Sequence, residues 1–280
     1  MALFLSEWKR TRKIEVSSKT WVIFIVVCFL ASTVGCICGI GGGVIIKPVL
    51  DAFGLYTAST ISFVSGCIVL SMTGYSVIKA AIAQEKNIEK GVSTYLGLGA
   101  AIGGIVGKLM LDGIKAATAN DALVGSVQSV VLLVVTLGTL IYLLLDRRIP
   151  THHVHHWCAC LGIGLLLGVI SSFLGIGGGP INLVVLSFFF SMETKKAAQN
   201  SLFIILLSQS ASLIFTLLRG TVPSFPPLLL AIMVLAGILG GVVGRRINKR
   251  IDAKTVRKLL VGLILVIIFI CCYNTWQYCH

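Results

Sequence analysis

The amino-acid sequence predicts an all-α polytopic membrane protein of about eight transmembrane helices, in two homologous repeats that each contain a glycine-rich broken helix. Composition supports the membrane assignment, because 56% of the 280 residues are hydrophobic and only 12% are charged, about half the charged fraction of a soluble protein. A motif that occurs twice supports the repeat: residues 39–43 and residues 175–179 both read GIGGG.

Eight apolar runs define the expected helices. Each run is close to the roughly 20 residues that a helix needs to cross a bilayer, and backbone polar groups in a membrane must be satisfied within each segment. In chain order the runs cover residues 20–38, 57–78, 92–111, 122–145, 157–176, 200–218, 226–244 and 256–276.

The first apolar run follows a basic segment, residues 1–19. We expect this run to be a retained helix and not a signal peptide, because it lacks a small-residue cleavage site and leads directly into the glycine motif. The formal net charge of +13 is explained by the excess of Lys and Arg that membrane proteins carry on cytoplasmic loops. It therefore does not indicate nucleic-acid binding.

Further matches between the two halves support the predicted repeat, and repeats of this kind decide the fold. The matched pairs, with their separations, are Gly39 and Gly175 (136), ASTISF at 58–63 and AAQNSL at 197–202 (139), GGIVGK at 103–108 and GGVVGR at 240–245 (137), and the closing helices at 124–145 and 256–276. The predicted organisation is a basic N-terminal tail (1–19), a first transmembrane repeat (20–146), an inter-repeat loop (147–156) and a second transmembrane repeat (157–280).

The distribution of basic residues predicts the orientation of the repeats. Residues 245–258 carry seven Lys and Arg and should therefore be cytoplasmic. If each broken helix counts as one crossing, each half crosses four times, and the two halves lie parallel. The alternative, five crossings in each half with the N-terminus inside, places residues 245–258 outside, so we expect the parallel topology, while the inverted one stays open.

The glycines have two expected roles. In GGIVGK and GGVVGR they are spaced as small residues that let membrane helices approach closely. The four glycines within residues 39–43 destabilise a helix on every side and indicate a break. A break exposes N–H groups at the positive end of the next half-helix, which bind anions, and paired breaks mark the substrate site of transporters. Pro180 suits the first turn of the second half-helix.

Small polar residues that follow the breaks complete the expected site, because polar side chains in membrane helices tend to face the bundle interior. Hydrogen bonding between helices is the alternative role, and Ser65 and Ser208 belong to the same polar segments. We expect a small anion to bind near the bilayer midplane, between the two breaks. The candidate substrate-binding residues are Gly39, Gly41, Gly42, Gly43, Ser59, Thr60, Ser62, Gly175, Gly177, Gly178, Gly179, Asn182, Gln199, Asn200 and Ser201.

Four charged residues lie within or beside the apolar runs. Lys47 could neutralise an anion, but we expect its side chain to extend to the membrane interface. Asp51, Glu85 and Glu193 lie near expected helix ends. Each could serve proton coupling, but a solvated interfacial charge is the expected role.

The glycine motifs and the segments after them resemble the sulfite exporter TauE/SafE family of membrane permeases. GIGGGVIIKP and GIGGGP each precede an A-x-x-x-S segment, and the resemblance covers nearly the whole chain. It implies a secondary transporter, of exporter type, for sulfite, a sulfonate or a related organic acid, with the glycines and the following polar residues as the site. SFVSGCIVLSM and AAQNSLFIILLSQ resemble one bacterial branch. Ile61 stands where many relatives have Thr, so the anion itself stays open.

A His- and Cys-rich stretch, residues 152–160, supports an alternative function as a transition-metal ion transporter. Its candidate ligands are His152, His153, His155 and His156. The first half has no matching cluster, so we rank this function second. A channel or a structural protein is a third class, but duplicated broken helices favour alternating access.

The sequence contains no nucleophile–base pair, metalloprotease motif or Walker loop, so we expect neither an enzyme nor a cofactor. The expected partners are a small anionic substrate and the lipid bilayer, without nucleic acid. Proton coupling is an available energy source, and the oligomeric state stays open. The expected location is the cell membrane of a bacterium, as a multi-pass protein.

Overall fold

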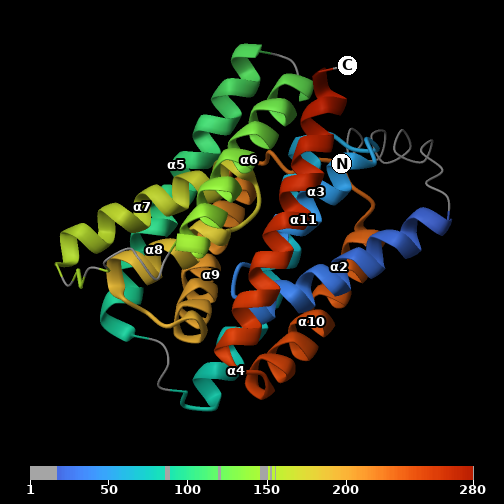
Figure 1. Cartoon of the computed structure of the whole chain (residues 1–280). Coiled ribbons are helices and arrows are strands. Elements are labelled where there is room, and N and C mark those ends of the chain that lie inside the picture. Colours follow the sequence, from blue (N-terminus) through green and yellow to red (C-terminus); the bar gives the residue numbers. More distant parts are fainter. Residues whose placement is uncertain are drawn as a thin grey trace.

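The fold is seen in a computed structural model that describes residues 18–85, 89–118, 121–145, 151, 153–154 and 156–279. These residues form helices and no strand (Figure 1). The first half contains α2 (Ser18–Cys38), α3 (Gly43–Ala52), α4 (Ala58–Ile82), α5 (Lys90–Thr118) and α6 (Asp121–Leu145). The second half contains α7 (Trp157–Leu174), α8 (Pro180–Phe190), α9 (Thr194–Leu218), α10 (Pro227–Arg250) and α11 (Ala253–Cys279).

Eight of these helices are long and apolar enough to cross a membrane. They are all the described helices except α3 and α8, and each coincides with one of the eight predicted apolar runs. The predicted all-α polytopic fold class is therefore confirmed. Most of the predicted basic tail (1–19) and of the predicted inter-repeat loop (147–156) lies outside the described residues, and the boundaries proposed for the two halves stay predictions.

The chain reverses direction at each glycine motif. In the first half, α2 ends at Cys38 and α3 begins at Gly43. The ring of Phe53, directly after α3, packs edge-on against Phe24 near the start of α2, with 5.4 Å between centroids. In the second half, the N–H of Val154, just before α7, donates to the carbonyl of Phe189 at the end of α8 (3.0 Å). Each pair of a long and a short helix therefore starts and ends at one end of the molecule.

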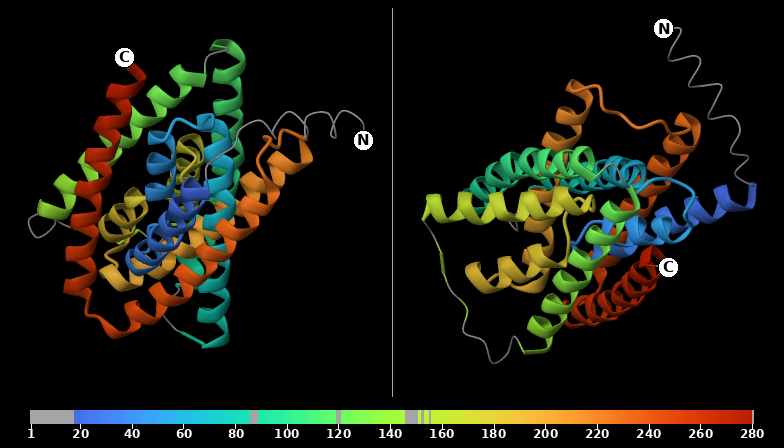
Figure 2. Two further views of the ribbon diagram at one scale, coloured as in Figure 1. Left: turned by 90° about the vertical axis from the view of Figure 1, so that its right-hand side faces the viewer. Right: turned by 90° about the horizontal axis from the view of Figure 1, so that it is seen from above.

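The two halves interlock, because helices of each half pack against the other half and equivalent helices make equivalent contacts. Helix α2 of the first half lies along α10 of the second (Figure 1), and α7 of the second lies along α5 of the first (Figure 2, right). In the same way α3 packs on α11 and α8 packs on α6, while α4 and α9 contact each other. Each half thus buries its helices mainly against the other half.

Glycines make the closest of these helix contacts, in two equivalent sets. Gly103 and Gly107 of α5 lie directly against the backbone of α7, and Gly240 and Gly244 of α10 lie against that of α2. This confirms the predicted packing role of the glycines in GGIVGK and GGVVGR. The contacted pairs are Gly103–Leu165, Gly107–Val169, Gly240–Phe29 and Gly244–Thr33. Equivalent positions are 136 or 137 residues apart, which supports the predicted repeat.

The parallel topology that we expected from the basic residues is wrong. Gly66 of α4 contacts Gln209 and Leu213 of α9, whereas Gly74, further along α4, contacts Leu206. The equivalent helices α4 and α9 are therefore antiparallel. The expectation failed because each broken helix counted as one crossing, whereas the chain turns back at the break. Three further helices in each half carry the chain across the membrane. Because three is odd, the second half begins on the opposite side and is inverted relative to the first.

We predict opposite effects for two glycine substitutions in α5. A Cβ on Gly103 would lie 2.1 Å from the carbonyl oxygen of Leu165, whereas a Cβ on Gly113 would meet nothing within 4 Å. Gly103→Ala should therefore lower the thermal unfolding temperature in detergent. Gly113→Ala should leave it unchanged or raise it, since Ala is favoured over Gly in a helix by about 1 kcal/mol. Equal behaviour of the two variants would contradict the helix contact.

Candidate functional site

The two glycine breaks are buried and interlocked with the opposite half. Gly39 and Gly175 both have a left-handed backbone, with φ of +75° and +66°, which favours glycine. A Cβ on Gly39 would lie 2.2 Å from Cα of Ala198, and a Cβ on Gly175 would lie 2.2 Å from Oγ of Ser62. Ala198 follows Ser62 by 136 positions, as Gly175 follows Gly39. The first break therefore packs against α9 and the second against α4, and each of these helices belongs to the other half.

This contact also corrects the alignment of the polar segments. The sequence match of ASTISF with AAQNSL uses a separation of 139 positions, whereas the contacts pair residues that are 136 apart. The equivalent of Ser62 is therefore Ala198, and the equivalent of Ser65 is Ser201. The two halves consequently do not carry the same polar groups next to their breaks.

Several N–H groups at the breaks do not donate. At the first break the N–H groups of Ile40, Ile45 and Ile46 donate to backbone carbonyls. Within the described residues, those of Gly41 and Gly42 make no such hydrogen bond. These donors lie just before α3, where a helix begins and its dipole is positive. The predicted chemistry of the break is therefore available, although the glycine loop itself is tightly packed.

Buried side chains without partners surround the breaks. Ser65 and Ser201, at equivalent positions, are fully buried, and neither hydroxyl has a hydrogen-bond partner in the described part of the chain. The Oγ of Ser65 lies 2.9 Å from where a Cβ on Gly43 would be. The Oδ1 of Asn182, in the first turn of α8, is also buried without a partner. Buried polar atoms are normally hydrogen-bonded, so three buried polar side chains without a partner are an unusual feature of the region around the breaks.

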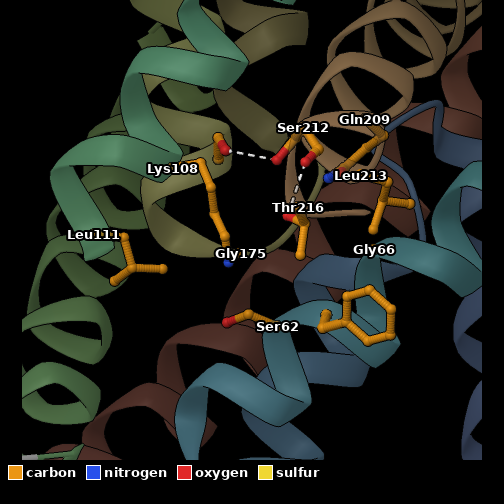
Figure 3. A pocket seen from close by; sticks show the side chains of 11 residues that line it. Ser62, Gly66, Lys108, Leu111, Gly175, Gln209, Ser212, Leu213 and Thr216 are labelled. Atoms are coloured by element: carbon orange, nitrogen blue, oxygen red, sulfur yellow. Dashed lines mark hydrogen bonds between the residues drawn. The ribbon is translucent and has the colours of Figure 1, made fainter. Parts of the chain in front are cut away.

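A polar pocket opens beside the second break, between α4, α5, α7 and α9 (Figure 3). With the open solvent at its mouth included, the space of this pocket amounts to about 350 Å³. We refer to it as the first pocket. Gly175 and Ser62 form part of its wall, and the polar residues around them are Lys108, Ser172, Gln209, Ser212 and Thr216.

Lys108 supplies the positive charge of the first pocket. It extends from α5 toward Ser62 and Gly175 (Figure 3), and its side chain is only 11% exposed. Its nearest carboxylate, Asp112, is 3.9 Å away and is also 3.9 Å from Arg219. A buried ammonium normally needs a close counter-ion, and here the ion pair is long and shared. The ammonium of Lys108 is therefore only partly compensated by Asp112.

The other polar side chains of the first pocket are held in place by their helices. Ser62 donates to the carbonyl of Ala58 (2.7 Å), and Ser172 and Ser212 share a hydrogen bond of 3.0 Å. Gln209, which lies against Gly177, has no hydrogen bond within the described residues, so its amide is free to donate. Lys108 and Gln209 thus provide a cation and a neutral donor, which together suit an anion with several oxygens.

Only some of the predicted site residues meet in a pocket. Ser62 and Gly175 line the first pocket, and Gln199 lines a second pocket near α10. The other glycines of the breaks, Gly39, Gly41, Gly42, Gly43, Gly177, Gly178 and Gly179, are buried, as are Asn182 and Ser201, and none of them lines the first pocket. None of these buried residues lines the second pocket either, so a site between the two breaks stays a prediction.

Three predicted site residues have structural partners instead. Ser59 accepts a hydrogen bond from Lys115. Thr60 donates its N–H to Oγ1 of Thr57, which caps the start of α4 (3.3 Å). Asn200 links α9 to α5, because its Oδ1 accepts from the N–H of Glu89 (3.0 Å) and from Ser93. These are the interhelical and capping roles that the sequence left open.

Lys108 is not among the substrate-binding residues predicted from the sequence. The match of GGIVGK with GGVVGR predicts helix packing alone, which gives Lys108 no role of its own. The signal that could have found the site is the last residue of each motif, because a cation, Lys108 or Arg245, stands at both equivalent positions. A charge kept at the same place in both halves of a membrane protein indicates more than packing.

Two expectations about charged residues are wrong. Lys47 does not extend to the interface, and Asp51 is not solvated: their side chains are 3% and 2% exposed and form an ion pair of 2.7 Å within α3. A lone charge there would be costly, so the two residues bury each other. Glu85 also forms ion pairs, with Arg245 and Lys249. Glu193, at the start of α9, is exposed.

The His-rich stretch is described only in part. His153 and His156 are exposed, whereas His152 and His155 lie outside the described residues. Among the residues that are described, no three His, Cys, Asp or Glu side chains lie together as metal ligands. The metal-transporter alternative therefore stays a hypothesis from sequence.

A comparison with protein families gives one match. The family described as sulfite exporter TauE/SafE matches residues 24–270, which is nearly the whole chain and includes both glycine breaks and both pockets. No curated protein and no solved structure matches the chain.

We predict that the contact between Gly175 and Ser62 is essential for the first pocket. Gly175→Ala should lower both stability and transport, because it strains a left-handed backbone and places Cβ against Ser62. Gly220 is the matched control: its φ is +65°, yet a Cβ there would meet nothing within 4 Å. Gly220→Ala should cost only the backbone strain, about 1–2 kcal/mol. Similar losses of transport in both variants would contradict the contact.

We predict that breaking the Lys47–Asp51 pair costs more than removing it. Asp51→Asn leaves a buried ammonium without its counter-ion and should cost roughly 3–5 kcal/mol. The double variant Lys47→Met, Asp51→Leu removes both charges and should recover most of that loss. Unfolding in a denaturing detergent measures both changes. A double variant no more stable than Asp51→Asn would contradict the pairing.

Proposed function

The chain belongs to the sulfite exporter TauE/SafE family and is therefore a membrane transporter, and from this premise we propose that it exports a small anion such as sulfite, a sulfonate or a related organic acid. We propose the first pocket as the binding site, in place of the glycine loops alone. The proposed location is the bacterial cell membrane, with secondary transport as the mode.

One observation carries the proposal: the ammonium of Lys108 is buried in a polar pocket, and its ion pair with Asp112 is long (3.9 Å) and shared with Arg219. Desolvated charge is costly unless it is well paired, and an anion that enters the pocket adds a second, closer negative charge. Gln209 can donate an additional hydrogen bond, and Gly175 keeps the second break against the pocket wall. The small size of the pocket favours an anion of a few heavy atoms.

The helices that line the pocket support the proposal of coupling between anion binding and a change of conformation. Its wall combines α4 of the first half with α7 and α9 of the second, so a bound anion contacts both halves at once. In transporters built from inverted repeats, one part rocks against the other around a central site. A second candidate function, transition-metal transport, finds no supporting observation among the described residues.

We predict that Lys108→Met lowers the initial rate of sulfite transport at least about tenfold, the scale of one charge-assisted hydrogen bond. The measurement is sulfite flux in proteoliposomes, beside a panel of sulfonates, small carboxylates and divalent metal ions. Lys254→Met, at an exposed residue outside both pockets, removes the same charge and should transport like the unchanged protein. Lys108→Arg should retain part of the rate.

Two results would contradict the proposed function. If the unchanged protein moves none of the anions in the panel, the assigned substrate class is wrong. If it moves sulfite and Lys108→Met does so equally well, the substrate class stands but the first pocket is not the site.

A further inference from the structure

A second pocket lies near the C-terminal end of α10, among α2, α4, α9 and α10. With the open solvent at its mouth included, its space amounts to about 310 Å³, close to the value for the first pocket. The lining residues that matter here are Cys36, Ser76, Ala198, Gln199, Arg245 and Lys249.

The second pocket is the counterpart of the first under exchange of the two halves. Its residues Cys36, Ser76 and Arg245 stand where the first pocket has Ser172, Ser212 and Lys108, at separations of 136, 136 and 137 positions. The internal contacts agree as well. Sγ of Cys36 lies 3.2 Å from Oγ of Ser76, as Oγ of Ser172 lies 3.0 Å from Oγ of Ser212. Because the repeat is inverted, the two pockets face opposite ends of the molecule.

The two pockets differ in how their cations are paired. In the second pocket the side chain of Arg245 is 14% exposed, and it donates to the carbonyl of Ser76 at 2.9 Å. Its other nitrogen lies 2.8 Å from Oε1 of Glu85, and Nζ of Lys249 lies 2.7 Å from the same oxygen. Gln199 contacts the second carboxylate oxygen of Glu85 at 3.4 Å. A carboxylate of the chain itself therefore neutralises the cation that corresponds to Lys108.

Glu85 stays ionised near neutral pH. Its partial burial raises its pKa, but the hydrogen bond from Lys249 and the charges of Arg245 and Lys249 outweigh burial and lower the pKa below its ordinary value. The ion pairs of Glu85 are therefore fully formed when the pH is above the ordinary pKa of a glutamate. They are lost only as the pH falls through the lowered pKa of Glu85. Two cations face one carboxylate, so the group keeps a net positive charge.

We propose that the second pocket is another binding site for the same class of anion, and that the carboxylate of Glu85 is a built-in competitor that holds this site closed when it is empty. The proposal rests on the proposed function. A sulfite or sulfonate offers Arg245 the same array of oxygens as a carboxylate, which the guanidinium recognises through paired hydrogen bonds. Binding of the anion displaces the Glu85 carboxylate from Arg245 and Lys249.

Charge indicates which face each pocket serves. The second pocket lies at the end of α10 that leads into residues 245–258, with seven Lys and Arg, and such segments are cytoplasmic. In export the second pocket therefore loads the anion and the first pocket releases it. The competing carboxylate stands on the side where the anion enters.

Uptake of sulfite into inverted membrane vesicles tests the proposal, because these vesicles present the cytoplasmic face to the medium. Glu85→Gln removes the competing charge, so the half-saturating sulfite concentration should fall, by about tenfold. Glu89→Gln is the matched control: Glu89 belongs to the same connection and pairs with Lys196, outside the second pocket. It should leave the half-saturating concentration unchanged.

Two further variants keep the test decisive if Glu85→Gln fails to fold. Arg245→Met should raise the half-saturating concentration at least about tenfold. Lys249→Gln alters a side chain that is 53% exposed, so folding should tolerate it, and it should raise the concentration by a smaller factor. Unchanged concentration dependence in these variants, with sulfite transport intact and sensitive to Lys108→Met, would overturn the second site alone. Absence of sulfite transport in the unchanged protein would instead overturn the proposed function.

Discussion

The close approach of each glycine break to the opposite half is the constraint on which the rest of the structure depends. Gly39 touches the backbone of Ala198, and Gly175 touches the side chain of Ser62. Neither contact leaves room for a Cβ, and both need a backbone that glycine adopts easily. Because the chain can turn back at these points, α3 and α8 return to the end from which α2 and α7 began. That reversal produces the inverted repeat and thereby places one pocket at each end.

The inverted repeat places equivalent residues around two pockets that differ in charge balance. Lys108 has only a long ion pair to Asp112, whereas Arg245 is held by Glu85 at hydrogen-bonding distance. An anion in the first pocket therefore adds a close negative charge beside Lys108. In the second pocket it must compete with the carboxylate of Glu85 for Arg245. Between the pockets lie the buried glycine loops and the hydroxyls of Ser65 and Ser201, which have no hydrogen-bond partner within the described residues.

Much of the fold could be predicted from sequence, because the membrane restricts it to helices. The eight apolar runs located the eight long helices, and Pro180 marked the first residue of α8. Topology could not be predicted, since apolarity does not show whether a chain continues or turns back at a glycine break. The site was predicted only in part. Ser62 and Gly175 do meet in a pocket, but the charge of Lys108 arrives from α5, and only three-dimensional packing brings that helix to the second break.

The central claim, that equivalent pockets open toward opposite faces, is tested most directly by thiol labelling at equivalent positions. Lys249 lines the second pocket with a side chain that is 53% exposed, and Asp112, which pairs with Lys108 and is 25% exposed, stands at the equivalent position 137 residues earlier. In a chain whose own cysteines are replaced, a membrane-impermeant maleimide should label Lys249→Cys from the cytoplasmic face and Asp112→Cys from the outer face. A sulfonate, which unlike sulfite does not react with maleimide, should slow both reactions. Labelling of both positions from the same face would contradict the account.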